Sequence, residues 1–304
     1  MDRVFYIIAI IIVIALGIKG KDFDWNTVTN QQVNTTSTQD QLETQNISNQ
    51  TILQNEANLR IYFIDVEQAD SILVIDRDKT MLIDAGTNKM GEKVVNFLKG
   101  KRITKIDYLI GTHPHEDHIG GLDEVIKNFD IGKIYMPKVQ NNTKTFEDVL
   151  DAIKEKNLKV TTPKVDDTFA LNMANCTIMS AREEGVQDNL NLSSIVIRMT
   201  YGEQSFLFMG DAEKENEQER LWTKTNVLKI GHHGSNTSSS EEFLKQVSPQ
   251  IAVISVGKDN TYGHPKQDTI DKLKNMGSAI YRTDKNGTIL IMSDGKNKVE
   301  TNIE

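Results

Sequence analysis

Three histidines and two acidic residues occupy the six positions 113–118, within the stretch THPHEDHIGG (residues 112–121). The chain has only 6 histidines among its 304 residues, so half of them lie here. Imidazole and carboxylate groups suit Zn, Mn or Fe. Four such side chains could hold two adjacent cations, or one cation with its ligands oriented by the others, whereas the alternative is a solvated polar loop. The sequence therefore predicts a metal site that includes His113, His115, Asp117 and His118.

The other histidines lie in two further loops of the same kind. His232 and His233 belong to LKIGHHGSN, and His264 belongs to TYGHPKQ. Each loop follows an expected strand and contains glycine, and residues at strand ends face the mouth of an α/β structure, where ligands bind. We expect the three loops to meet at one site. The alternative for His264 is a turn residue fixed by Pro265.

Two carboxylates also stand at expected strand ends. Asp84 ends the strand of MLIDAG, and Asp211 follows the strand of LFMGDA. A carboxylate in such a place can cap a helix or form a turn. For Asp84 we leave open both this structural role and a role in the metal site. For Asp211 we favour a metal ligand that bridges two ions.

The elements that position these residues begin at Leu59. Short β-branched runs predict strands, and apolar residues at helical spacing predict helices. Their order is strands, alternating helices and strands, more strands, and a second alternation, which favours two mixed halves with a two-sheet interior over one doubly wound parallel sheet. The expected helices are 91–101, 122–129, 146–157, 213–222, 241–247 and 267–277. The expected strands are 59–66, 71–76, 80–86, 106–112, 133–136, 167–171, 175–180, 193–202, 204–210, 226–230, 251–257, 279–283, 288–293 and 298–303.

The segment before this domain differs in composition. Residues 4–18 are almost wholly apolar, with Arg3 before them and Lys19 after them. A spanning helix needs about 20 apolar residues, so this length fits a signal peptide better, although a short membrane anchor stays open. We predict a signal peptide or N-terminal anchor at 1–20, a disordered polar linker rich in Asn, Gln, Thr and Ser at 21–58, and a domain at 59–304 outside the cytoplasm.

Charge and cysteine content exclude several classes. The net charge is −8, which argues against a generally basic nucleic-acid binder, although LKGKRITK (residues 98–105) is a local basic strip. The alternative for this strip is a solvated helix end. The single Cys176 permits no disulfide within the chain and no Cys-rich zinc site.

These motifs together resemble a known family. THPHEDH is similar to the HxHxDH signature of the metallo-β-lactamase superfamily, and LIDAG, LFMGDA and GHHGS match its flanking motifs in order. The resemblance is strongest to the extracytoplasmic hydrolase domain of ComEC-type DNA-uptake proteins and their stand-alone relatives. It includes DVEQADS (65–71), Asn191 with Ser194, YGHP (262–265) and RTDKNG (282–287).

The resemblance implies an α+β fold, a four-layer αββα sandwich with two divalent ions, Zn or Mn, at one edge. His113 and His115 would hold the first ion and Asp117 and His118 the second, with Asp211 as the bridge. His232, rather than His233, would complete the second site. The remaining motif residues would orient a ligand or contact substrate: Asp70, Asp84, Asn191 and Ser194.

Two departures from the family pattern stand out. No histidine lies between His118 and His232, where many members of the superfamily supply a further ligand. Glu67 and Ala69 replace glycines of the first motif, so Glu67 would hinder a close approach of the backbone to a phosphate.

The expected function is a metal-dependent hydrolase in which metal-activated water attacks a phosphodiester, with DNA as one candidate substrate. Asp117, His233 and His264 are the candidate catalytic residues, and either histidine would protonate the leaving oxygen or bind a phosphate oxygen. One alternative is hydrolysis of another extracellular ester, such as phosphorylcholine on cell-wall polymers, or of a lactone or lactam. A second alternative is a metal-binding scaffold without activity.

Overall fold

The computed structural model describes residues 59–296 and 299–303. The expected signal peptide or anchor at 1–20 and the linker at 21–58 lie outside the described residues. Within the described part, no helix combines the length and the apolar character needed to cross a membrane.

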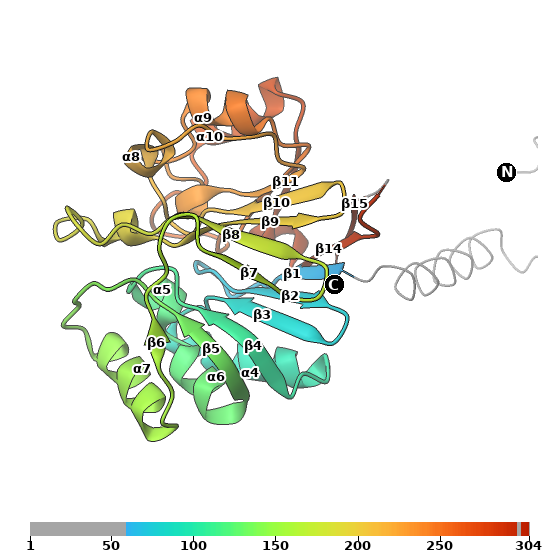
Figure 1. Ribbon diagram of the computed structural model, residues 1–304. Helices are drawn as coiled ribbons and strands as arrows, with labels where there is room; N and C mark the ends of the chain where they lie inside the picture. Colours follow the sequence, from blue (N-terminus) through green and yellow to red (C-terminus); the bar gives the residue numbers. More distant parts are fainter. Residues whose placement is uncertain (1–58, 297–298, 304) are drawn as a thin grey trace, which may run out of the picture. The chain divides into compact units, whose positions relative to one another are not determined.

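Two β-sheets face each other, and helices cover the outer face of each (Figure 1). The first sheet has the order β15-β14-β1-β2-β3-β4-β5-β6. Its strands are β1 (Leu59–Phe63), β2 (Ile72–Asp76), β3 (Lys79–Ile83), β4 (Lys105–Ile110), β5 (Asp130–Tyr135), β6 (Val160–Thr161), β14 (Ile289–Ser293) and β15 (Val299–Ile303).

The second sheet has the order β13-β12-β11-β10-β9-β8-β7. Its strands are β7 (Thr168–Ala170), β8 (Asn175–Ser180), β9 (Val196–Tyr201), β10 (Gln204–Phe208), β11 (Val227–Lys229), β12 (Ile251–Ile254) and β13 (Ala279–Arg282). In each sheet an antiparallel set leads into parallel strands, β3 to β6 in the first and β10 to β13 in the second. The two mixed halves expected from the sequence are therefore present.

The helices form two outer layers, one from each half of the chain. The first half carries α4 (Gly91–Gly100), α5 (Glu116–Ile119), α6 (Leu122–Asn128) and α7 (Lys144–Glu155), with the short 3-10 turn η1 (Asn88–Met90). The second half carries α8 (Lys214–Glu217), α9 (Glu241–Val247), α10 (Gln267–Asn275) and α11 (Thr283–Asn286), with η2 (Leu190–Ser193) and η3 (Gly231–Gly234).

Alternation along the strands explains the four layers. In β2, Ile72 and Val74 point toward the second sheet, whereas Leu73 packs under the first helix layer. In β10, Phe206 and Phe208 point between the sheets. Successive side chains of a strand face opposite sides, so a strand that is apolar throughout must be covered on both. The αββα sandwich predicted from the sequence is confirmed.

One expected helix is much shorter than predicted. The segment 213–222 forms only one turn, α8. The Glu217 side chain accepts hydrogen bonds from the backbone N–H groups of Ser239 (2.5 Å) and Ser240 (2.9 Å). Trp222 turns inward to meet the ring of Phe243 at 5.1 Å, and its indole N–H donates to the Glu217 carbonyl oxygen. These tertiary contacts replace the helical ones that the local pattern favoured.

Candidate metal centre

The histidine and aspartate side chains singled out in the sequence meet beyond the ends of the central strands. Residues 113–118 follow β4, Asp84 follows β3, and Asp211 follows β10. The tandem histidines follow β11, which pairs with β10 in parallel. Parallel neighbours end at the same edge of a sheet, so these loops converge there. The site is thus assembled from both halves of the chain.

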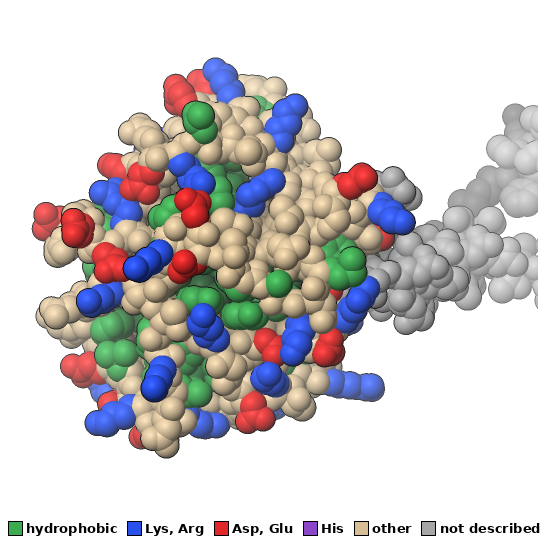
Figure 2. Space-filling view, viewed as in Figure 1, with side chains coloured by type: hydrophobic (Ala, Val, Ile, Leu, Met, Phe, Trp, Pro, Cys, Tyr) green, Lys and Arg blue, Asp and Glu red, His purple; other side chains and the backbone are tan. Residues whose placement is uncertain are grey.

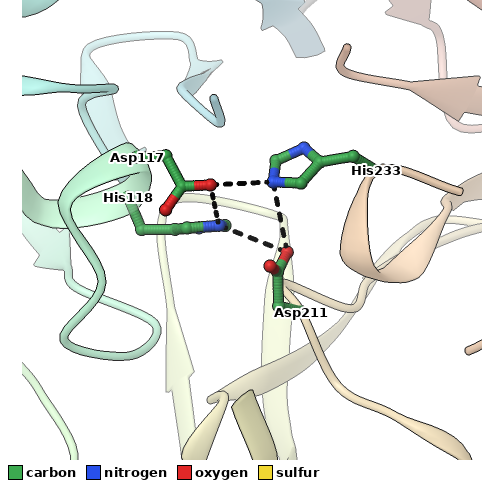
Figure 3. A group of neighbouring side chains, drawn as sticks. All are labelled: Asp117, His118, Asp211 and His233. Carbon is green, nitrogen blue, oxygen red and sulfur yellow. Dashed lines mark hydrogen bonds and ion pairs between the residues drawn. The ribbon is translucent and has the colours of Figure 1, made fainter. Parts of the chain in front are cut away.

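Four side chains form one close group: Asp117, His118, Asp211 and His233 (Figure 3). Each offers one ligand atom, and these atoms all lie within 4.8 Å of one another. The Nε2 atom of His118 lies 3.2 Å from Oδ1 of Asp211, and Nε2 of His233 lies 3.2 Å from Oδ2 of Asp117. Donors bound to one ion at about 2.0–2.2 Å lie roughly 3.3–3.6 Å apart, so this group has the dimensions of a cation site.

Two atoms of this group are buried without a hydrogen bond. They are Nε2 of His118 and Oδ1 of Asp211. Burial opposes the charged form of His118, but the carboxylates of Asp211 and Asp117 outweigh it and raise the pKa of His118 well above its ordinary value. The position therefore favours positive charge. These two atoms face each other at 3.2 Å with no hydrogen bond to any other group, an arrangement that fits ligands of a divalent cation.

His113 and His115 lie beside this group. Nε2 of His113 lies 3.0 Å from Nδ1 of His115 and 3.9 Å from Oδ2 of Asp211. Burial and the neighbouring His118 lower the pKa of His113 well below its ordinary value, so this imidazole is neutral and able to bind a metal. The two oxygens of Asp211 thus face different histidines, Oδ1 toward His118 and Oδ2 toward His113.

Asp84 lies behind His118. Its Oδ2 atom lies 2.8 Å from Nδ1 of His118 and accepts a hydrogen bond from the Thr112 hydroxyl at 2.7 Å, while its Oδ1 accepts one from the Thr112 backbone N–H at 2.8 Å. A carboxylate at Nδ1 directs Nε2 of His118 at the group. Asp84 has a φ of 58°, so it also forms the turn after β3. Asp84 therefore has both roles that the sequence left open, since it forms a turn and it contacts a histidine of the site.

The tandem histidines differ from the arrangement chosen from the sequence. The structure places His233, not His232, in the group with Asp117, His118 and Asp211. Nδ1 of His233 lies 2.9 Å from the carbonyl oxygen of Ser255, which fixes the ring. Both histidines have left-handed backbone angles, φ 47° and 51°, and the motif order cannot reveal which ring such a turn directs inward.

His232 instead contacts Glu213, a residue that the sequence analysis did not single out. Nδ1 of His232 lies 3.2 Å from Oε1 of Glu213 and 2.9 Å from the Thr237 hydroxyl, while its Nε2 lies 3.7 Å from Oδ2 of Asp211. Burial raises the pKa of Glu213, but hydrogen bonds from His232 and Asn191 outweigh it and lower the value to about 2. Glu213 sat in an expected helix, so no local signal separated it from a solvated residue.

Lys229 is a second residue that the sequence analysis missed. It is fully buried, and its Nζ lies 2.7 Å from Oδ2 of Asp70 and donates to the carbonyl oxygen of Ile230 at 2.9 Å. Oδ1 of Asp70 lies 3.5 Å from Nδ1 of His233. A lysine within the apolar strand NVLKI was the available signal, because a buried lysine needs a partner. Asp70 therefore supports the site from behind and does not line the cleft.

A cleft of about 360 Å³ opens over the group. Its lining residues are Gln68, His115, Glu116, Asp117, Asn191, Asp211, His232, His233, Tyr262 and His264. Asn191 donates to Glu213 at 3.0 Å, and the Ser194 hydroxyl accepts from the backbone N–H of Asp211 at 3.1 Å. Burial, with the nearby His232 and His233, lowers the pKa of His264 to about 4. His264 is therefore a neutral imidazole beside the group at pH 7.

Comparison with known proteins gives a consistent result. The family model described as the Metallo-beta-lactamase superfamily matches residues 64–258. ComE operon protein 3 of Bacillus subtilis is 35% identical over 248 residues, which cover 74% of this chain and 32% of that protein. Recombination protein 2 of Haemophilus influenzae is 28% identical over 240 residues, which cover 75% of this chain and 28% of that protein. The chain thus spans about a third of the length of these curated relatives.

The same fold occurs among solved structures. The metallo-beta-lactamase fold protein YhfI from Bacillus subtilis matches with a TM-score of 0.51 and 13% identity, and the match covers 74% of this chain and 95% of that one. At this identity the likeness concerns the fold.

Proposed function

The chain belongs to the metallo-beta-lactamase superfamily, and we propose on that premise that it is a metal-dependent phosphodiesterase with DNA among its substrates. The observation that carries the proposal is the group of Asp117, His118, Asp211 and His233 at the floor of an open cleft. Relatives named as a recombination protein and as a competence protein support DNA as the substrate to test.

Two divalent ions, Zn or Mn, fit the donor set. Asp117, His118 and His233 would hold one ion and His113 and His115 the other, with Asp211 contributing to both sites. When bound, such ions act as Lewis acids and generate a nucleophile from water at neutral pH.

The chain supplies the orientation of the ligands. Asp84 at His118 and the Ser255 carbonyl at His233 each occupy the Nδ1 side of an imidazole, so both Nε2 atoms face the centre. Ser194 holds the backbone of Asp211 in the same way. These contacts hold the ligand side chains in place before an ion binds, which reduces the loss of conformational entropy on metal binding.

His264 is the residue we assign to the substrate. It lines the cleft, and its ring stands 5.6 Å from that of His232. Its Nδ1 is buried without a partner, while Asn260 anchors its backbone at both N–H (3.0 Å) and carbonyl (2.7 Å). A neutral imidazole held in this way can donate one hydrogen bond to a phosphate oxygen or to the leaving oxygen.

The intact donor set supports an enzyme over a scaffold domain that kept only the fold. A scaffold would tolerate loss of Asp117, Asp211 or His233, and all three are present. Other esters, including phosphorylcholine esters, and lactones or lactams remain alternatives for a substrate panel.

The test uses the full chain, stripped with a chelator and reloaded with Zn or Mn. We expect close to two bound equivalents by elemental analysis, and cleavage of bis-p-nitrophenyl phosphate and single-stranded DNA. Asp211→Ala is expected to lose both binding and cleavage. Asp123→Ala is the matched control, because this carboxylate pairs with Lys127 on α6 and does not line the cleft. Metal binding without cleavage of either substrate would refute the phosphodiesterase and redirect the search to other esters. Absence of both would refute the metal-dependent hydrolase.

We also propose that the domain acts outside the cytoplasm. The support is the apolar segment 4–18 with its flanking basic residues. Protease added to intact producing cells should then degrade the domain. Complete protection until the cells are broken would overturn this location.

A further inference from the structure

Tyr262 is displayed at the rim of the cleft. Its relative exposure is 65%, and no other aromatic residue among 59–296 and 299–303 is classed as exposed. Tyr201 and Trp222, by contrast, are buried at 3% and 6% exposure. A single exposed aromatic side chain is ordinary on a protein surface, so its surroundings decide whether it has a role.

The loop that carries Tyr262 is braced. The Asn260 amide donates to the carbonyl oxygens of Gly257 (3.0 Å) and His264 (2.7 Å), and Lys266 donates to the carbonyl oxygen of Tyr262 at 2.7 Å. These bonds hold the loop from inside on both sides of the tyrosine. The backbone that carries the ring is therefore held in place, which reduces the entropy lost when a ligand packs on the ring.

A series of rings connects Tyr262 with the metal group. The Tyr262 ring lies 5.8 Å from that of His264 with an interplanar angle of 24°. His264 meets His232 at 5.6 Å, and His232 meets His233 at 6.3 Å. A phosphodiester over the group would thus share the cleft with an aromatic face.

Positive side chains do not line this cleft. Besides the metal-binding Asp117 and Asp211, its lining includes the acidic Glu116, and neither Lys nor Arg occurs among the lining residues in the described part of the chain. On the face seen in Figure 2, where no histidine is visible, Lys and Arg are interspersed with Asp and Glu. The basic strip at 98–105 ends where β4 begins, whereas the site follows the other end of β4, about 20 Å away along the strand. Within the cleft, contacts from Lys or Arg to phosphate are therefore few, and Lys266 at the rim is already bonded to the carbonyl oxygen of Tyr262.

We infer that Tyr262 is a stacking platform for an unpaired nucleobase next to the scissile phosphodiester, which makes single-stranded nucleic acid the substrate class of this site. The inference rests on the proposed function for its chemistry. Stacking is the contribution that remains when phosphate contacts are few, and every base has a face that can take part. Paired bases are stacked on their neighbours and cannot use the platform.

The test compares Tyr262→Ala and Tyr262→Phe in the full, metal-loaded chain. The substrates are a single-stranded oligonucleotide and an abasic strand of the same length and charge. We expect Tyr262→Ala to raise KM for the oligonucleotide by roughly 5- to 150-fold and to leave KM for the abasic strand unchanged. Tyr262→Phe keeps the ring and should behave as the unaltered chain. Leu221→Ala, at another exposed apolar side chain that does not line the cleft, should change neither.

Binding is measured separately from cleavage by the anisotropy of a labelled phosphorothioate oligonucleotide. Binding that depends on the Tyr262 ring, without cleavage of any phosphodiester, would support the platform and overturn the proposed function. Cleavage of both strands with KM values indifferent to Tyr262→Ala would overturn the platform and keep the function. A loss confined to p-nitrophenyl phosphorylcholine would show that the ring recognises a cationic headgroup, and it too would overturn the nucleobase inference.

Discussion

Replacing Lys229 by methionine should destabilise the fold strongly. Methionine has nearly the length of lysine and no charge, so Lys229→Met leaves the carboxylate of Asp70, which is 1% exposed, without its cation at 2.7 Å. Breaking a buried ion pair by removing one partner costs about 3–5 kcal/mol. A domain of 150–250 residues loses about 2–4 °C of melting temperature per kcal/mol, so we expect a decrease of about 6–20 °C.

The measurement is urea unfolding followed by circular dichroism, with a chelator present so that metal binding does not contribute. Asp70→Asn alone should also be costly, because it leaves the buried ammonium of Lys229 partly unpaired. The double variant should lose about 2 kcal/mol less than the sum of the two single variants, since neither charge then remains. A cost for Lys229→Met below about 1 kcal/mol, or additive single effects, would refute a coupled buried pair behind His233.

Three further predictions concern the site, the first motif and the first sheet. Asp84→Asn should weaken Zn affinity about 10- to 100-fold in a chelator competition, because His118 loses the carboxylate that orients it; unchanged affinity would contradict this role. Glu67→Gly should raise the free energy of unfolding by up to about 1 kcal/mol, since Glu67 has a φ of 62°, and a clear loss in urea unfolding would show that its side chain matters. Burial raises the pKa of Asp107, but hydrogen bonds from Lys105 and the Thr80 backbone outweigh it and hold the value below 3.8. The stability lost in Asp107→Asn should therefore be seen in full above about pH 5 and should shrink as the pH falls through the native pKa of Asp107; a difference independent of pH from 2 to 7 would contradict this assignment.

The local patterns were sufficient for most of the fold. Apolar runs such as 72–75 and 206–209 require cover on both faces. Helices α4 and α7 supply the outer cover of the first sheet, and α9 and α10 supply that of the second, which is why composition and periodicity predicted the layers. The pattern failed at 213–222. That segment has good helix formers, but Glu217 and Trp222 make their contacts with residues 239–243. Local spacing within 213–222 carries no information about these contacts.

For the site, the amino-acid sequence was enough to predict which kinds of metal ligand are present and that they follow strands. Parallel strands of a sheet end at the same edge, so histidine and aspartate at those ends were expected to lie close together. The sequence did not predict which ring of the tandem histidines faces Asp117 and Asp211, and the folded structure was needed to show it. The folded structure also showed that Glu213 holds His232, that Lys229 is buried against Asp70, and that Tyr262 is exposed whereas Tyr201 and Trp222 are not. The physical reason is that the direction and burial of a side chain depend on backbone angles and on partners distant in the sequence, and residue type alone fixes neither.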